Sequence, residues 1–127
     1  MYKVQIRHKQ DLAFTVKARE SEFIIDAKGN GLTPLDVLLA GLGSCIGVYI
    51  SKYAQGAKLN LENYQINVSA ELSAEAPFSF KLINVELDLK NCPLDERRQK
   101  ALLEFIKHCP AHNTLKGNPQ IEFKFTC

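Results

Sequence analysis

The feature that most constrains this chain is an apolar stretch rich in small residues, which runs from Thr33 to Gly56. Thr33 is a favourable N-cap residue, Pro34 suits the first helical position, and Asp36 lies where a capping box places its acidic partner. Because Gly56 is typical of a C-terminal stop, the pattern predicts a helix from residue 34 to about residue 55. Apolar residues surround the whole helix, which predicts a buried central position.

Three glycines inside this helix need a physical reason, because each costs about 1 kcal/mol relative to alanine. Gly41, Gly43 and Gly47 lie among other small residues around Cys45. A helix without side chains at these positions can be approached closely. The pattern therefore predicts that another backbone or a ligand comes close to this part of the helix.

Alternation of apolar and polar residues predicts strands on both sides of the helix. Residues 1–26 contain three such runs, with a hairpin tip expected at His8–Asp11. Residues 64–72 and 78–89 form two longer runs, which we expect to pair as a hairpin. The alternation slips by one residue near Ile83–Asn84, and this predicts a bulge there.

The remaining segments complete the predicted order of elements. Lys28–Gly31 is expected to be a loop, because Gly and Asn tolerate positive φ. A second helix is predicted from Asp95 to His108, and Ile121–Phe125 has the alternation of a final strand. Three strands, a helix, two strands, a helix and a strand indicate an α+β fold, which we expect to form a single domain over residues 1–127.

The composition is that of a globular protein with its own core, at 46% hydrophobic and 24% charged residues. The net charge is +2 with a pI of about 8.3, and basic residues alternate with acidic ones rather than forming the stripe of a nucleic-acid-binding protein. No signal-peptide pattern is present, and the stretch Val37–Ile50 is too short and too rich in glycine to predict a membrane span. We therefore expect a cytoplasmic protein with no nucleic-acid or membrane partner.

Two of the four cysteines lie in settings that favour chemistry over a structural disulfide, since cytoplasmic thiols are kept reduced. A free cysteine such as Cys45 is more often a small buried apolar residue, but the neighbouring glycines leave space around its sulfur. Cys109 precedes Pro110, which suits the start of a helical turn, so Cys109 is predicted to be an N-cap whose thiolate the backbone N–H groups would stabilise. A protonated His108 or His112 would act in the same direction. A loop cysteine without a role is the alternative interpretation for Cys109.

The other two cysteines are expected to be bystanders. Cys92 also precedes a proline, but it ends a strand ahead of a helix. Cys127 is the last residue, where chains commonly fray.

Other kinds of site are less well supported by the sequence. Cys109 and His112 have a short ligand-like spacing, and His108 adds a nitrogen, but a zinc site would need Cys45 from the buried helix and no Cys-x-x-Cys pair is present. The glycines lie within the helix rather than before it, which does not match a dinucleotide-binding loop. A Cys-His-carboxylate hydrolase is compatible with the spacing, although no local hydrolase signature supports it. We expect neither a metal nor a cofactor.

Two segments together resemble the OsmC/Ohr family of osmotically induced and organic hydroperoxide resistance proteins. The first is Leu32–Cys45, a proline followed by an apolar helix that contains Gly-Ser-Cys, and the second is Cys109–Leu115, which begins 64 positions after Cys45. The predicted order of elements also fits an OsmC-like member along essentially the whole chain. The resemblance implies an intertwined homodimer, in which two long central helices are buried back to back and wrapped by sheets to which both chains contribute.

The resemblance also implies a thiol-dependent peroxidase. Cys45 would attack a hydroperoxide and become a sulfenic acid, and Cys109 would condense with it to form a disulfide. An external dithiol or a lipoylated protein would restore both thiols by exchange. This chemistry requires the two Cα atoms to lie within about 7 Å of each other, and a positive group to hold Cys45 as a thiolate.

The chain departs from the peroxidase members of the family at one position. Those members carry a Glu directly after the helix-opening proline, and it pairs with an Arg near the reactive cysteine, whereas this chain has Leu35. Asp36 is the next residue and shorter, and its role as a helix cap is the stronger interpretation. Arg7 is the first candidate for the family Arg, with Arg19 second.

Three functional hypotheses follow. The leading one is a peroxidase that reduces organic hydroperoxides, and potentially hydrogen peroxide, with Cys45, Cys109, Arg7 and Asp36 as the candidate catalytic residues. The missing Glu favours a second, an OsmC-like protein that responds to redox state or binds a small molecule without turnover. A structural dimer with inert thiols is the third.

Overall fold

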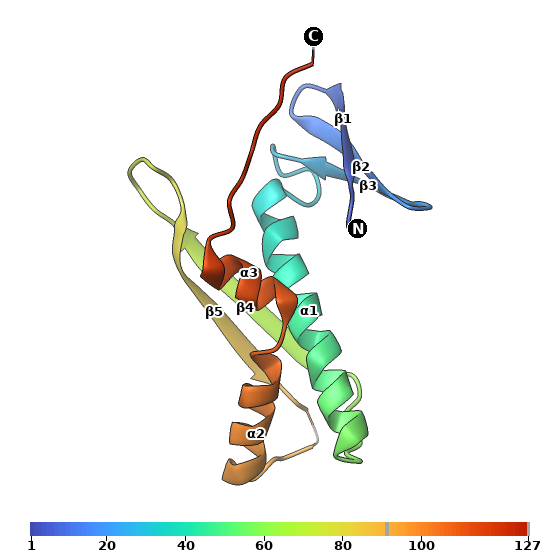
Figure 1. The fold of residues 1–127 in the computed structure, drawn as a ribbon, viewed down its shortest axis with the longest axis vertical. Helices are drawn as coiled ribbons and strands as arrows, with labels where there is room; N and C mark the ends of the chain where they lie inside the picture. The colour runs from blue at the N-terminus through green and yellow to red at the C-terminus, as the bar shows by residue number, and fades with distance from the viewer. Residues whose placement is uncertain (91, 127) are drawn as a thin grey trace. The chain divides into compact units, whose positions relative to one another are not determined.

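The structure is a computed structural model that describes residues 1–90 and 92–126. Its helices and strands follow the predicted α+β order (Figure 1): β1 (Gln5–Gln10), β2 (Ala13–Ala18), β3 (Ser21–Asp26), α1 (Pro34–Gly56), β4 (Gln65–Leu72), β5 (Phe80–Asp88), α2 (Glu96–Ile106) and α3 (Pro110–Gly117). Contacts divide the chain into two compact units, Met1–Ala40 and Gly41–Cys127.

The first unit contains an antiparallel sheet in the order β1–β2–β3. The predicted hairpin tip at His8–Asp11 is wrong in part, because His8–Gln10 belongs to β1 and the turn is made by the next two residues. Asp11 adopts a φ of 52° there, a value that Asp tolerates better than most residues. Ala13 and Val16 on the central strand are the buried apolar residues of this sheet.

Helix α1 begins at Pro34 and ends at Gly56, close to the predicted bounds. The Thr33 N–H donates to the Asp36 carboxylate over 3.0 Å, and the Asp36 N–H donates to the Thr33 hydroxyl over 3.2 Å. This reciprocal pair confirms the predicted capping box, which satisfies two backbone donors at the start of the helix.

Only one face of α1 is buried, so the prediction of burial all round is wrong for the single chain. The buried residues share this face: Leu42, Gly43, Ile46, Ile50 and Ala54. Leu38 and Val48 are 42% and 50% exposed on the rest of the helix surface. An apolar pattern identifies residues that favour burial, but it does not say which neighbour covers them.

The length of α1 also corrects an argument made from sequence. With 23 residues and a mean hydropathy of 1.5 over an 18-residue window, α1 is long and apolar enough to cross a membrane, so it is not too short. The core helix of a soluble protein meets the same criterion, which makes length and composition weak evidence for a span.

Two glycines of α1 allow β4 to pack closely, as the sequence predicted. A Cβ at Gly43 would lie 2.9 Å from Val68 Cγ2, and one at Gly47 would lie 3.2 Å from Ile66 Cδ1. The Tyr64 hydroxyl also donates to the Gly47 carbonyl over 2.9 Å. A Cβ at Gly41, by contrast, would meet no atom within 4 Å.

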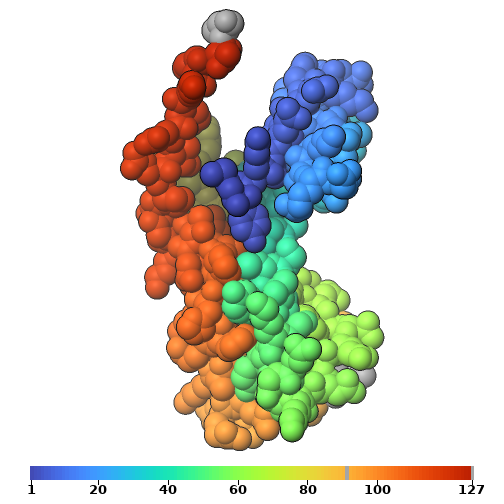
Figure 2. Space-filling view, turned by 45° about the vertical axis from the view of Figure 1, so that its right-hand side comes forward, coloured from blue at the N-terminus to red at the C-terminus, as the bar shows by residue number. Residues whose placement is uncertain are grey.

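In the second unit, α1, α2 and α3 all pack against the β4–β5 hairpin around a shared core (Figure 1), and Figure 2 shows α2 beside α1. Strands β4 and β5 pair antiparallel, and their register shifts between Ala70 and Leu72, opposite Phe80 and Ile83. The bulge therefore lies next to the position that the sequence predicted. Helix α2 is capped by Asp95, which accepts a hydrogen bond from the Arg98 N–H. The core of this unit is a single cluster: Leu42, Ile46, Ile50, Ala54, Leu61, Leu94, Leu102, Ile106 and Cys109.

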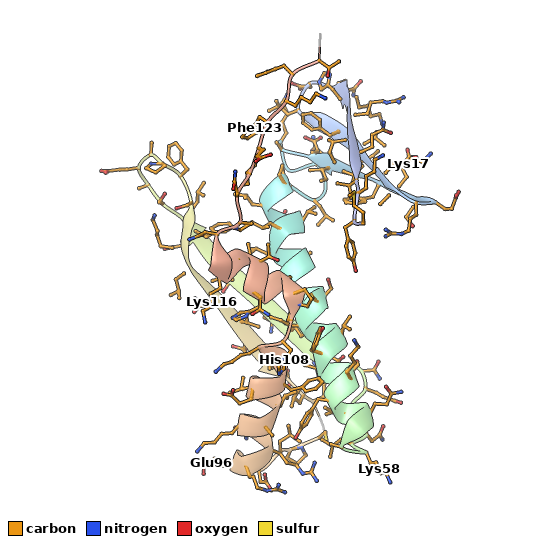
Figure 3. The ribbon with its side chains drawn as sticks, viewed as in Figure 1. Lys17, Lys58, Glu96, His108, Lys116 and Phe123 are labelled. Atoms are coloured by element: carbon orange, nitrogen blue, oxygen red, sulfur yellow. The ribbon has the colours of Figure 1, made fainter. Side chains whose placement is uncertain are left out.

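The predicted final strand is absent from the described part of the chain. Residues 118–126 form neither helix nor strand, and Phe123 lies on a segment that extends away from α3 (Figure 3). Ile121, Phe123 and Phe125 are 73%, 88% and 92% exposed. The alternation is real, but no strand within residues 1–90 and 92–126 pairs with this segment, and a lone strand has no partner for its backbone groups.

Candidate functional site

Cys109 is held at the junction of two helices. Helix α2 ends at Ile106, whose carbonyl accepts a hydrogen bond from the Cys109 N–H over 2.9 Å. Cys109 has extended backbone angles, φ −62° and ψ 121°, and Pro110 then opens α3. The Asn113 N–H donates to the Cys109 carbonyl over 3.0 Å, which closes the first turn. The prediction that Cys109 is an N-cap residue is therefore confirmed.

Cys45 and Cys109 meet in the core of the second unit. Cys109 is completely buried, with 0% exposed, and Cys45 is half-buried and packs against the same core cluster. Both residues have free thiols, and the Cys45 side chain lies close enough to Cys109 to raise the pKa of its thiol. The structure thus brings together the two cysteines that the sequence singled out from different helices.

The environment of Cys109 changes its acidity in two directions. Burial raises the pKa of the Cys109 thiol above its ordinary value of 9.0, and the interaction with Cys45 raises it further. Although the sulfur makes no capping hydrogen bond, the backbone N–H groups of His112 and Ala111 lower this pKa by favouring the thiolate. Desolvation is the largest of these effects, so the protonated thiol is the favoured form of Cys109 in the folded protein.

The two histidines near Cys109 face other partners. The His108 ring packs edge-on against Phe105 with 6.2 Å between ring centroids, and Figure 3 shows His108 where α2 meets α3. His112 Nδ1 lies 3.2 Å from Asn113 Oδ1. Among residues 1–90 and 92–126, no group of three or more His, Cys, Asp or Glu side chains gathers in a way that could hold a metal ion.

The remaining cysteines lie apart from this pair. Cys92 is half-buried and lines a pocket between β5 and α2 together with Leu89, Leu94 and Leu102. Cys127, which we expected to be a bystander, lies outside the described residues.

The predicted charged groups both belong to the first unit. Arg7 is exposed on β1, opposite Thr15 of β2, and lines a surface pocket with Lys17 and Glu22. Asp36 caps α1, and the hydrogen bonds from the Thr33 backbone and side chain lower the pKa of its carboxyl.

Sequence reasoning did not single out the aromatic residues that lie beside Cys45 along α1. Tyr49 follows Cys45 by one helical turn, and its ring lies 5.8 Å from that of Phe105. Tyr53, one turn further, lies 5.9 Å from the same ring. The i, i+4 spacing of Cys45, Tyr49 and Tyr53 places them on one side of the helix and could have revealed this stripe.

Comparison with known proteins places this geometry in a family. A sequence profile of the OsmC-like protein family matches residues 27–124. The hydroperoxide reductases of Mycoplasma pneumoniae and Mycoplasma genitalium are 27% and 28% identical over 121 and 116 residues, covering 89% and 88% of this chain and 85% and 78% of theirs. The crystal structure of an OsmC-like protein from Mycoplasma pneumoniae has a TM-score of 0.80 at 27% identity, covering 92% of this chain and 88% of that chain. The chain therefore belongs to the OsmC-like protein family.

Proposed function

We propose that this protein is a thiol-dependent peroxidase that reduces organic hydroperoxides with Cys45 and Cys109. The observation that carries the proposal is the direct interaction of these two free thiols within one chain. The relatives named hydroperoxide reductase support the same class of substrate. Hydrogen peroxide is a potential further substrate.

The proposed reaction uses each sulfur once per turnover. The Cys45 thiolate attacks the distal oxygen of the hydroperoxide, the O–O bond breaks, and the alcohol leaves with a proton. Cys45 is then a sulfenic acid, and Cys109 Sγ attacks its sulfur, which releases water and forms the Cys45–Cys109 disulfide. A dithiol, free or carried as a lipoyl group on a protein, reduces the disulfide.

The charged groups that would support Cys45 are part of the proposal. Arg7 is the candidate for the cation that favours the Cys45 thiolate, and Asp36 is the nearest carboxylate in sequence to the position where peroxidase members carry Glu. Asp36 already accepts hydrogen bonds at the start of α1, so we expect its contribution to be the smaller of the two.

The proposal is tested by measuring peroxide consumption with cumene hydroperoxide and dithiothreitol. Cys45→Ser should abolish turnover, because no nucleophile remains. Cys109→Ser should stop the cycle after the first step and leave a sulfenic acid that dimedone traps. Cys92→Ser is the matched control, since it removes a half-buried thiol elsewhere and should keep full activity. Turnover by Cys45→Ser, or none by the unmodified protein with any dithiol, would reject the peroxidase.

A second candidate is a redox-responsive or small-molecule-binding protein that does not turn over. The observation that favours it is Leu35, an apolar residue where peroxidase members place a carboxylate. This candidate predicts one stoichiometric oxidation of Cys45 and Cys109 without recycling by dithiols.

The proposal includes a homodimer in the cytoplasm, where free thiols persist. Two apolar surfaces of the chain support association: the open side of α1 with Leu38 and Val48, and the alternating residues of segment 121–125. Exposed apolar surface of this kind marks sites of protein contact. Sedimentation equilibrium should give a dimer, and a monomer at every concentration would reject this part of the proposal.

A further inference from the structure

We propose that Phe105 is a positioning residue, whose ring fixes α2 along α1 and thereby holds Cys109 against Cys45. The inference rests on the proposed function, because it concerns the step in which the two sulfurs join. It adds a residue that acts on this step through packing and takes no part in the chemistry.

The ring of Phe105 lies between two tyrosines of α1. Its centroid is 5.8 Å from that of Tyr49 and 5.9 Å from that of Tyr53, and both pairs are tilted. These separations and angles are those at which aromatic rings attract each other beyond the burial of their surface. Because the two tyrosines are one helical turn apart, the Phe105 ring loses one contact if α2 slides along α1 in either direction.

This ring contact lies one step away from the two cysteines. Helices α1 and α2 run side by side in opposite directions (Figures 1 and 2). Tyr49 follows Cys45 by four residues, and Phe105 precedes Cys109 by four. The contact of Tyr49 with Phe105 is therefore about one helical turn from the place where the cysteines meet. A shift of α2 along α1 moves Cys109 relative to Cys45.

The backbone between each ring and its cysteine is hydrogen-bonded. The His108 N–H donates to the Phe105 carbonyl over 3.1 Å, and the Cys109 N–H donates to a carbonyl of the last turn of α2 over 2.9 Å. Cys45 and Tyr49 belong to the same continuous helix. The position of the ring is thus passed to both sulfurs. All these contacts form within one chain, so they do not depend on surface that a second copy covers.

Disulfide formation is sensitive to such positioning, because the new bond tolerates a narrow range of Cα separations. Two groups held in place also react at an effective concentration far above that of dissolved partners. In the proposed cycle, Cys109 Sγ attacks Cys45 Sγ, the S–O bond breaks, and the oxygen leaves as water with the Cys109 proton. Loss of the ring should slow this step and leave the earlier attack of Cys45 on the peroxide unchanged.

The pairing of the sulfurs is measured without peroxide, by equilibrating the full chain with reduced and oxidised glutathione. The two protein thiols give two electrons and two protons to glutathione disulfide, which becomes two glutathione thiols. After acid quenching and alkylation, the disulfide is detected as the joined tryptic peptides 29–52 and 108–116. Phe105→Leu should lower the equilibrium constant at least about tenfold, which raises the reduction potential by about 30 mV. Phe105→Tyr retains the ring and should keep the original value.

A control variant separates positioning from general stability. Leu94 is 9% exposed and precedes α2 at the end away from Cys109. Leu94→Ala should destabilise the fold at least as much as Phe105→Leu, yet leave the disulfide equilibrium nearly unchanged as long as both variants are folded. Thermal unfolding and circular dichroism establish this. An unchanged equilibrium in Phe105→Leu, or an equal fall in Leu94→Ala, would overturn the inference.

The contact with Tyr49 is tested by combining variants. Tyr49→Leu should also lower the equilibrium constant, and the double variant with Phe105→Leu should lose less than the product of the two separate effects, because both changes remove the same contact. Two fully independent effects would overturn the role of this ring pair.

A single turnover with cumene hydroperoxide separates the inference from the proposed function. Phe105→Leu should oxidise Cys45 at the rate of the unmodified protein but accumulate a sulfenic acid that dimedone traps. If the unmodified protein forms the disulfide with glutathione but consumes no peroxide, the peroxidase fails while the positioning role stands. If peroxide turnover is intact and Phe105→Leu changes neither the equilibrium nor the lifetime of the sulfenic acid, the positioning role fails alone. Absence of the disulfide from the unmodified protein in both experiments would overturn both.

Discussion

The two sides of α1 are built from similar apolar residues but have different surroundings. One side, with Leu42, Ile46 and Ile50, is covered by the chain's own strands and helices. The other side, which includes Gly41 and Val48, is open in the single chain. Cys45 lies between the two, half-buried at the edge of the covered side. The comparison shows that one helix can both complete a core and carry the half-buried sulfur for which we propose a reaction, and that hydrophobicity alone does not separate these roles.

The largest expected effect is a loss of stability from a substitution on the covered side of α1. Ile50 is 0% exposed, so Ile50→Ala should lower the free energy of unfolding by about 2–5 kcal/mol through lost burial and a cavity. Urea unfolding at several protein concentrations measures it, and the loss should not depend on concentration. Val48→Ala is the matched control on the open side. A loss below about 1 kcal/mol at Ile50 would mean that the two sides do not differ as described.

A substitution on the open side of α1 should weaken the association of two chains rather than the folding of one chain. Val48→Lys places a charge at a position that is 50% exposed, which the single chain tolerates but a dry interface does not. We expect an unchanged helical signal in circular dichroism and a dimer dissociation constant raised at least about tenfold, or 1.4 kcal/mol. Sedimentation measures the constant. An undisturbed dimer would place the second copy elsewhere on the chain.

Replacing a glycine of α1 with alanine should change the free energy of unfolding in opposite directions on the two sides of the helix. At Gly43 a new methyl group would meet Val68 Cγ2 at 2.9 Å, and the stiff β-branched side chain of Val68 can yield little. Gly43→Ala should therefore destabilise the protein by about 1 kcal/mol or more despite its higher helix propensity. Gly41→Ala meets no atom and should stabilise it by up to about 1 kcal/mol. Thermal unfolding measures both, and effects of the same sign would contradict the comparison.

The smallest expected effect is a pH dependence from the covered side. Because burial raises the pKa of Cys109 above 9.0, the folded reduced protein holds the thiol proton to a higher pH than the unfolded chain does. This stabilisation is complete below pH 9 and is lost as the pH rises through the raised pKa. The free energy of unfolding should therefore fall above pH 9, and Cys109→Ala should flatten that slope, whereas Cys92→Ala should not. If the free energy of unfolding of Cys109→Ala falls just as steeply above pH 9, other titrating groups cause the pH dependence.

Local sequence signals predicted the parts of the fold that local physics determines. The Thr33–Asp36 capping box, the glycine contacts with β4 and the N-cap position of Cys109 were all correct, because each depends on residues close in sequence or on the size of one side chain. The site pairing of Cys45 with Cys109 came from family resemblance, since spacing of 64 positions carries no geometry by itself.

The errors share a different cause. Segment 121–125 alternates like a strand and the open side of α1 is apolar like a core, yet neither is covered by its own chain. Sequence patterns report that a segment favours a partner but not whether that partner is the same molecule. The aromatic stripe of Tyr49 and Tyr53 was missed because its contact residue, Phe105, comes from a helix more than fifty positions away.

The aromatic stripe beside Cys45 has a practical optical consequence. The chain contains four tyrosines and no tryptophan, so its ultraviolet emission comes from tyrosine alone. Tyr49 follows Cys45 by one helical turn, with Tyr53 one turn further, and a disulfide quenches nearby tyrosine emission by accepting an electron from the excited ring. If the proposed Cys45–Cys109 disulfide forms, tyrosine emission should fall on oxidation and recover on reduction, and the change can be followed in real time without a label.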